Sequence, residues 1–214
     1  MGVELYNDLK SAILSYDAAK TAQLAQQIVQ QSLDPLAAFE AMTDAIRHVG
    51  EQFGEGILFL PELVGAAEAM QAATPVLTEE IEQQGGQRES AGKVVIGSVF
   101  GDMHNIGKTM VCTLLTADGF EVIDLGINVE THQFVEAVKA HDADIVAMSA
   151  LLTTTAHEQK KVIDSLVEDG LRDKVKVMVG GGAISDEFAE SIGADGYDPM
   201  APGAVKLARQ FMGL

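Results

Sequence analysis

Residues 93–109 read KVVIGSVFGDMHNIGKT, in which a run rich in Val and Ile ends in a glycine-bearing loop and the start of a helix. Such short runs predict strands, because β-branched side chains fit a pleated sheet, and further runs lie at 121–125, 144–149, 174–179 and, more weakly, 194–197. Each run is followed by a helix-length segment, the last one from about residue 201. Alternating strands and helices predict a flavodoxin-like (Rossmann-like) α/β domain, with a five-stranded parallel sheet covered on both faces.

The first 83 or so residues carry apolar side chains at helical spacing and almost no strand signal. Helix starts are marked by Asp17 and by Asp34 followed by Pro35, because Asp caps helices and Pro is accepted in the first turn. Pro61 opens a fourth helix, and Pro75 is expected to kink or divide it. Four short helices joined by short turns predict an antiparallel bundle.

Residues 84–90, QGGQRES, are polar and glycine-bearing without periodicity, so they are interpreted as a linker. We therefore expect two domains, a helical cap at residues 1–88 and an α/β domain at residues 89–214.

The 32 acidic side chains outnumber the 14 basic ones, which gives the 214 residues a formal net charge of −18. An acidic surface repels phosphate backbones and anionic membranes, so we expect neither nucleic acid nor membrane as a partner. The single cysteine, Cys112, excludes an internal disulfide framework and any multi-cysteine metal site. The sequence shows no signal-peptide pattern and no apolar run near the ~18 residues of a membrane span. These features predict a cytoplasmic protein.

In a doubly wound sheet of order 2-1-3-4-5, ligands bind at the carboxyl ends of strands 1 and 3, where the chain direction reverses. The loop after strand 1 nearly imitates a phosphate-binding P-loop. However, the position five residues before Gly107 is Asp102, a carboxylate that would repel phosphate. Gly180-x-Gly182-x-x-Ser185 likewise lacks the last glycine of a dinucleotide fingerprint. Nucleotide hydrolysis and nicotinamide chemistry are therefore disfavoured.

The same loop contains Asp102-x-His104, with Gly107 three residues after the histidine. A neutral imidazole is a good ligand for a transition metal, and a carboxylate on its second nitrogen fixes the tautomer. Because only one protein ligand is present locally, a metal already carried in a macrocycle is favoured over a bare ion. Cobalt in a corrin ring fits this description.

Three motifs occur in order along the second half of the chain, Asp102-x-His104-x-x-Gly107, Ser149-x-Leu151 with Thr153, and Gly180-Gly181. Together they resemble the cobalamin-binding domain shared by methionine synthase and the corrinoid proteins of methyltransferase systems. The helical half, with the run GEGILFLPEL at residues 54–63, is similar to the cap bundle of the small corrinoid proteins that serve methanol, methylamine, betaine or methoxyarene methyltransferases. The resemblance covers essentially the whole chain.

The resemblance implies a role for each motif residue. His104 would displace the cofactor's dimethylbenzimidazole and ligate cobalt, and Asp102 would hydrogen-bond its other nitrogen. The remaining residues would bind the cofactor, with Gly107 and Gly180-Gly181 leaving room for the nucleotide tail and Tyr197 closing the far end of its channel. The cofactor-binding set that this implies is Asp102, Met103, His104, Ile106, Gly107, Ser149, Leu151, Thr153, Gly180, Gly181 and Tyr197.

The function implied is that of a corrinoid methyl carrier, a subunit of a methyltransferase system. It would shuttle a methyl group by way of Co(I) and methyl-Co(III). Its partners would be a substrate-specific methyltransferase, a second, acceptor methyltransferase and a reductive activase. Two alternatives stay open: a cobalamin-dependent sensor or regulatory protein, and the cofactor subunit of an adenosylcobalamin mutase. A bundle cap over the upper face of the corrin would be out of place in such a mutase.

Other residues whose side chains could carry chemistry are interpreted as structural. Cys112 is interpreted as a small buried apolar residue, not as a nucleophile. Lys108 and Thr109 are interpreted as first-turn helix residues. No motif surrounds the remaining histidines, which are His48, His132, His141 and His157.

Overall fold

A computed structural model of the chain describes residues 2–84 and 90–214. The chain divides into two compact units, Met1–Glu89 and Ser90–Leu214. The predicted domain boundary at residues 88 and 89 and most of the predicted linker lie outside the described residues. No described helix is long and apolar enough to cross a membrane.

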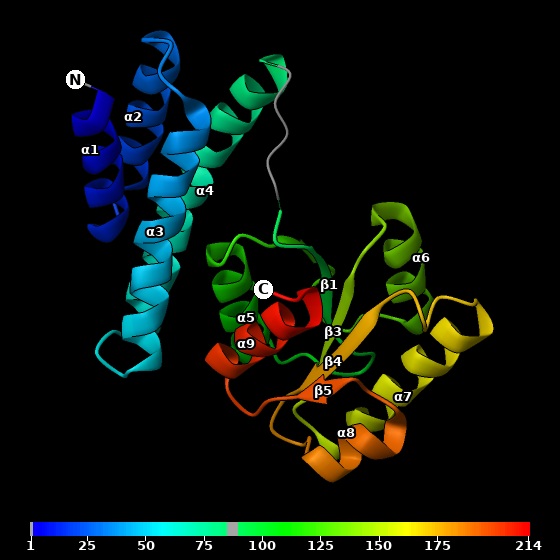
Figure 1. The fold of residues 1–214 in the computed structure, drawn as a ribbon. Coiled ribbons are helices and arrows are strands. Elements are labelled where there is room, and N and C mark those ends of the chain that lie inside the picture. The colour runs from blue at the N-terminus through cyan, green and yellow to red at the C-terminus, as the bar shows by residue number, and fades with distance from the viewer. Residues whose placement is uncertain (1, 85–89) are drawn as a thin grey trace. The chain divides into compact units, whose positions relative to one another are not determined.

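In its described part, the first unit consists of four helices, as predicted (Figure 1). They are α1 (Gly2–Leu14), α2 (Ala18–Gln30), α3 (Pro35–Gly54) and α4 (Leu60–Gln83). Both predicted amino-terminal caps are confirmed. The Asp17 carboxylate accepts a hydrogen bond from the Lys20 N–H at 2.9 Å, and the Asp34 carboxylate accepts one from the Leu36 N–H at 2.9 Å. The helices enclose a shared core that includes Leu9, Ile13, Ile28, Met42, Ile46, Leu63, Met70 and Leu77.

Of the kink or division expected at Pro75, the division is wrong, because α4 continues through this residue. Proline removes one backbone hydrogen bond, which leaves the carbonyl of Gln71 without its helical donor. Pro75 and Gln71 are both on the exposed side of the helix, where water can satisfy that carbonyl. Ala73 and Leu77 on the opposite side are fully buried, so packing stabilises the helix on both sides of Pro75.

The second unit alternates strands and helices (Figure 1). Its elements are β1 (Lys93–Ser98), α5 (Ile106–Ala117), β2 (Glu121–Asp124), α6 (Thr131–His141), β3 (Ile145–Ser149), α7 (Thr153–Glu168), β4 (Lys176–Gly180), α8 (Asp186–Ile192), β5 (Gly196–Tyr197) and α9 (Ala201–Met212). All neighbouring strands are parallel and their order is β2-β1-β3-β4-β5. The five-stranded flavodoxin-like sheet is therefore confirmed.

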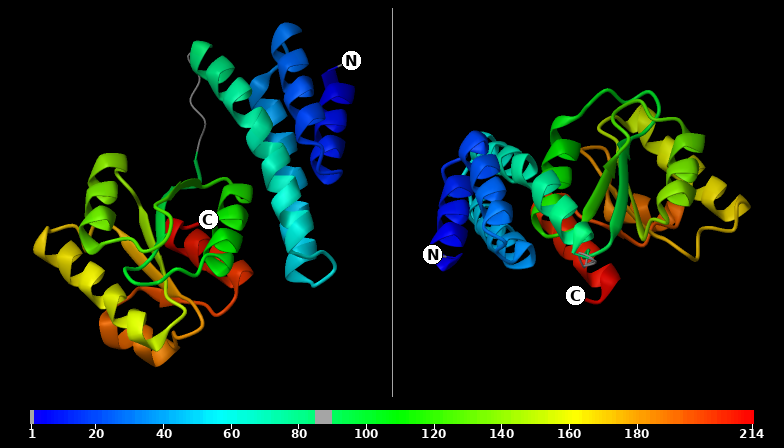
Figure 2. Two further views of the ribbon diagram at one scale, coloured as in Figure 1. Left: turned by 180° about the vertical axis from the view of Figure 1, so that it is seen from behind. Right: turned by 90° about the horizontal axis from the view of Figure 1, so that it is seen from above.

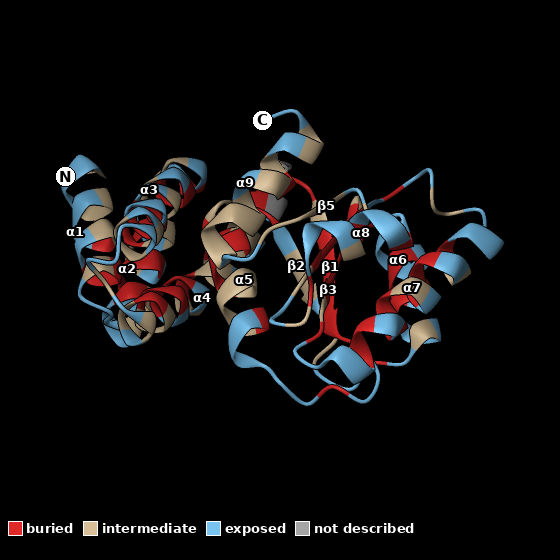
Figure 3. Cartoon of the chain, turned by 90° about the horizontal axis from the view of Figure 1, so that it is seen from below, coloured by how far each residue is buried: buried red, intermediate tan, exposed pale blue. Residues whose placement is uncertain are grey.

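Helices cover both faces of this sheet (Figure 2). Side chains of α6, α7 and α8 pack on one face, around Phe134, Val162 and Ile192. Side chains of α5 and α9 pack on the other, around Leu115 and Ala208. The central strands are accordingly the most buried part of the unit (Figure 3). This layering leaves the carboxyl edge of the sheet as the place where loops can form a site.

Candidate functional site

The carboxyl ends of the three central strands lie side by side. In the sheet register Ser98 of β1 pairs with Ser149 of β3, and Ser149 pairs with Gly180 of β4. The second and third motifs identified in the sequence begin at Ser149 and Gly180 themselves, and the first begins at Asp102, four residues after Ser98. The sheet therefore brings together, at one edge, motifs that lie up to about 80 residues apart.

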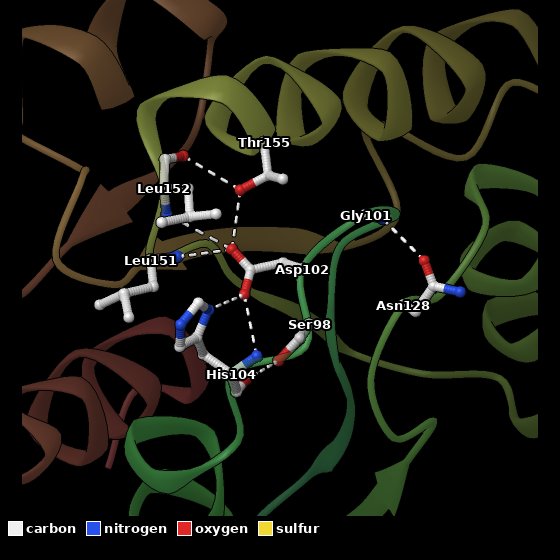
Figure 4. Close-up of polar contacts among 8 residues, drawn as sticks. All are labelled: Ser98, Gly101, Asp102, His104, Asn128, Leu151, Leu152 and Thr155. Carbon is white, nitrogen blue, oxygen red and sulfur yellow. Dashed lines mark hydrogen bonds and ion pairs between the residues drawn. The ribbon is translucent and has the colours of Figure 1, made fainter.

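A histidine and a carboxylate form the polar centre of this edge (Figure 4). The ring Nδ1 of His104 lies 2.8 Å from Oδ1 of Asp102, and the His104 backbone N–H donates to the same oxygen at 3.0 Å. The Asp102 side chain is 1% exposed, whereas that of His104 is 48% exposed. Since the carboxylate holds the proton on Nδ1, the Nε2 lone pair is left for a metal.

The second oxygen of Asp102 is held by the start of α7. Its Oδ2 accepts hydrogen bonds from Thr155 Oγ1 at 2.7 Å and from the Leu151 N–H at 2.8 Å. Burial by itself raises the pKa of Asp102, but the hydrogen bonds from Thr155, His104 and Leu151 outweigh it and hold the pKa well below its usual range. Asp102 is therefore a buried carboxylate that stays ionised at neutral pH beside the imidazole.

Sequence reasoning missed Thr155. It singled out Thr153, which is exposed. Helical periodicity carried the missing signal, because Thr155 lies on the same buried stripe of α7 as Gln159, Val162 and Leu166. Only the third of the three consecutive threonines faces the protein interior and can reach Asp102.

Further hydrogen bonds hold the backbone of the loop that carries Asp102 and His104. Gly101 adopts a positive φ of 79°, and its N–H donates to Oδ1 of Asn128 at 2.7 Å. The Asn128 N–H donates to the Asp102 carbonyl at 3.0 Å. Ser98 Oγ donates to the carbonyl of His104 at 2.7 Å. The backbone on both sides of the histidine is thus fixed by hydrogen bonds (Figure 4).

A largely apolar cavity of about 800 Å³ opens beside His104. Most residues predicted to bind the cofactor line it, namely Met103, His104, Ile106, Gly107, Ser149, Leu151, Gly180, Gly181 and Tyr197. Asp102 lies behind His104, and Thr153 is not among the lining residues. Sequence reasoning did not identify the lining contributed by α9 and the loop before it, which includes Pro199, Met200, Ala204 and Leu207. The volume suits a cofactor side arm of several rings.

Two glycines of the site differ in what they make room for. Gly181 has a φ of 114°, and a Cβ there would lie 2.1 Å from the carbonyl oxygen of Ala150, so the loops after β3 and β4 can pack only with glycine. A Cβ on Gly107 would meet no protein atom within 4 Å and would project into open space. Glycine at position 107 is consistent with a ligand passing close to the backbone.

Lys108 departs from its expected role as an ordinary first-turn residue. Its side chain is 1% exposed, and its Nζ lies 2.5 Å from each carboxylate oxygen of Asp124 at the end of β2.

Cys112 lies one helical turn after Lys108. Burial and the charge of Asp124 raise the pKa of the Cys112 thiol to about 12. The thiol is therefore protonated, as expected for a residue that is not a nucleophile.

The site as a whole offers a metal a single protein ligand. Among residues 2–84 and 90–214 there is no group of three or more His, Cys, Asp or Glu side chains that could hold a bare ion. A free imidazole nitrogen, an ionised carboxylate behind it and an apolar cavity beside it suit a metal that arrives within its own macrocycle. The fold and the site thus define a protein that binds a macrocyclic metal cofactor.

Comparison with known proteins identifies the cofactor. A family model described as a B12 binding domain matches residues 92–205, and a second model of the same description matches residues 5–78. A trimethylamine corrinoid protein of Methanosarcina mazei is 42% identical over 203 residues, which cover 94% of this chain and 93% of the relative. A corrinoid protein of Desulfitobacterium hafniense is 41% identical over 215 residues, which cover 100% of this chain and 100% of the relative.

Solved structures agree in fold. The methanol:cobalamin methyltransferase complex MtaBC of Methanosarcina barkeri contains a chain that matches with a TM-score of 0.89 and 29% identity, over 98% of this chain and 80% of that one. A cobalamin-binding protein of Desulfitobacterium hafniense matches with a TM-score of 0.71 and 30% identity, over 96% and 98% of the two chains. The present chain belongs to the B12-binding family, among the corrinoid proteins of methyltransferase systems, and its cofactor is cobalamin.

Proposed function

We propose that this protein is a methyl carrier that binds cobalamin with the dimethylbenzimidazole base displaced and with His104 as the lower ligand of cobalt. The observation that carries the proposal is the His104–Asp102 pair. The Nδ1 of His104 lies 2.8 Å from the buried carboxylate of Asp102, and the half-exposed imidazole ring leaves Nε2 available beside the cavity. When bound, the cobalt supplies a centre that accepts a methyl group from one molecule and gives it to another.

In this proposal the cavity holds the displaced nucleotide tail. Gly107 lets the backbone approach it, and Ser149, Leu151 and Tyr197 form its walls. Met103 and Ile106 are exposed apolar residues, 64% and 71% exposed, that flank the histidine and would pack against the corrin. A role for Thr153 in the tail pocket stays a prediction.

Asp102 and the groups around it hold the proton of the lower ligand. The carboxylate keeps Nδ1 protonated and makes Nε2 a stronger donor. Thr155 and the Leu151 N–H keep the carboxylate ionised and oriented. The chain itself thus supplies a lower ligand of tuned strength, and we propose that the reacting groups are held by partner proteins.

The names of the relatives support the choice of partners. The similar chains include a trimethylamine and a dimethylamine corrinoid protein, and a similar structure is part of a methanol methyltransferase complex. We propose a substrate-specific methyltransferase as methyl donor partner, a second methyltransferase as acceptor partner and a reductive activase. The net charge of −18 favours docking to basic surfaces and, with the single cysteine, fits a cytoplasmic location. The division into a cap at residues 1–88 and a cobalamin domain at residues 89–214 is part of this proposal.

The test begins with reconstitution of the purified chain with methylcobalamin. Wild type is expected to show the absorbance spectrum of a histidine-ligated, base-displaced corrinoid, and His104→Ala is expected to lose that spectrum or the cofactor. His132→Ala is a matched control, because His132 also pairs with a carboxylate, Glu130 at 3.3 Å, but is exposed and outside the cavity. An unchanged spectrum in His104→Ala would refute the ligand assignment.

A second experiment distinguishes a methyl carrier from a sensor. Methyl transfer to a thiol with a candidate partner supports the carrier, whereas bound adenosylcobalamin with light-dependent oligomerisation would establish a sensor instead.

A further inference from the structure

Lys108 is a charged side chain with almost no access to solvent. It is 1% exposed, and its Nζ contacts both oxygens of Asp124 at 2.5 Å. Asp124 is 42% exposed, and its Oδ1 also accepts the Gly126 N–H at 2.8 Å. Burying an ammonium group is costly unless it is paired in this way, so the lysine is committed to this one contact.

The pair joins two elements that border the cofactor site. Lys108 lies in the first turn of α5, directly after Gly107, and it lines the same cavity as Gly107 and His104. Asp124 lies at the end of β2, the edge strand of the sheet. The ion pair therefore fastens the beginning of the helix to the edge of the sheet.

Within the described residues, the cap position at the beginning of α5, Asn105, provides no side-chain hydrogen bond. The other end of the loop is held by the bonds to Asp102 and by Ser98 on the His104 carbonyl. The segment between the metal ligand and the helix is thus anchored at one end by the Asp102 network and at the other by Lys108.

We propose that Lys108 is a positioning residue of the cobalamin site, acting through its ion pair with Asp124. The pair holds the first turn of α5 in the place that keeps the cavity wall at Gly107 open and keeps His104 in reach of the cobalt. Lys108 acts through the backbone and touches no reacting atom. This inference rests on the proposed function, since it assumes that cobalamin is bound through His104.

The decisive variant is Lys108→Met, which keeps an unbranched apolar stem in the cavity wall and removes only the ammonium group. The partly exposed Asp124 can then be solvated, so the fold is expected to survive. The control is Lys139→Met, which breaks an ion pair with Asp169 of 2.9 Å on the other face of the sheet, outside the cobalamin cavity. Asp124→Asn removes the same attraction from the other side, and it decides the question if Lys108→Met fails to fold.

Two measurements separate positioning from general stability. In the protein without cofactor, amide hydrogen exchange at residues 105–109 is expected to accelerate in Lys108→Met and not in the control. In the loaded protein, cobalamin release is expected to be about tenfold faster, the lower end of the effect of removing an outer partner of a metal ligand. The Co(II) form is expected to lose part of the three-line nitrogen splitting that a bound imidazole imposes on its electron paramagnetic resonance spectrum.

Each outcome has a definite meaning. Unchanged exchange, or a release rate raised no more than in Lys139→Met, would overturn the inference while the wild-type spectrum still supports the proposed function. An effect in Lys108→Met that is absent from Asp124→Asn would also overturn it, because the pair would then not be the cause. If wild type itself shows no nitrogen splitting from His104, the proposed function fails and the inference about cofactor retention fails with it.

Discussion

Thr155 Oγ1 donates a hydrogen bond of 2.7 Å to Oδ2 of Asp102, a residue 53 positions earlier in the chain. The contact links the start of α7 to the loop that carries the proposed cobalt ligand. It also completes a relay from Thr155 through Asp102 to His104, in which each group is within hydrogen-bond distance of the next.

Replacing Thr155 tests this relay. Thr155→Val keeps the shape but removes the hydroxyl donor, so we expect the apoprotein to lose about 1–3 kcal/mol in unfolding free energy and the cofactor to bind more weakly. Urea unfolding and cobalamin titration measure the two effects. Thr153→Val is the matched control, because that hydroxyl is on an exposed residue two positions earlier. Equal effects in the two variants would show that the Thr155 hydroxyl has no special role.

The low pKa of Asp102 predicts an acid-sensitive component of stability. Because folding lowers this pKa below the unfolded value of about 4, the stabilisation is fully present above pH 4 and declines as the pH falls further. Asp102→Asn is expected to destabilise the apoprotein at pH 7 and to approach wild type in acid. Urea unfolding at a series of pH values from 7 to 3 measures this. Asp44→Asn, whose side chain is 63% exposed, is the control for loss of a surface carboxylate and is expected to change the unfolding free energy at pH 7 by much less.

Cys112 is expected to be unreactive in the folded protein. Burial and Asp124 raise its pKa to about 12, so at pH 8 almost none of the reactive thiolate is present. Folding keeps this proton while the unfolded thiol loses it above about pH 8.5, so the unfolding free energy should decline as the pH rises beyond that value. Labelling with a thiol reagent at pH 8 should be slow in buffer and fast in urea. Rapid labelling of the native protein would contradict the assigned environment.

The two glycines of the site should respond differently to alanine. Gly181→Ala is expected to cost about 3 kcal/mol, because the new Cβ meets the Ala150 backbone and the residue has a positive φ. Gly107→Ala should leave the apoprotein as stable as wild type or up to about 1 kcal/mol more stable, since alanine favours helices. The same variant should bind cobalamin less well if the tail passes close to Gly107. Thermal unfolding of the apoprotein and cobalamin titration distinguish the two cases.

Local sequence patterns predicted most of the fold. Val- and Ile-rich runs separated by helix-length segments specify parallel strands with crossover helices, and the structure has that order of elements. Asp17 and Asp34 were identifiable as helix caps because a cap acts on residues two or three positions away. The continuity of α4 through Pro75 was not predictable in this way, because it depends on the burial of Ala73 and Leu77 in the folded protein.

The site, like the fold, was predictable from the sequence only where its contacts are local. The sequence by itself determined the pairing of Asp102 with His104, because two residues in one loop need no long-range contact to meet, and a single imidazole implied a metal within a macrocycle. Only the tertiary structure showed that Thr155 binds Asp102, that Lys108 is buried on Asp124 and that Gly181 packs on Ala150. These contacts join segments 16 to 53 residues apart, and their partners are chosen by strand register and helix rotation, which no local pattern specifies.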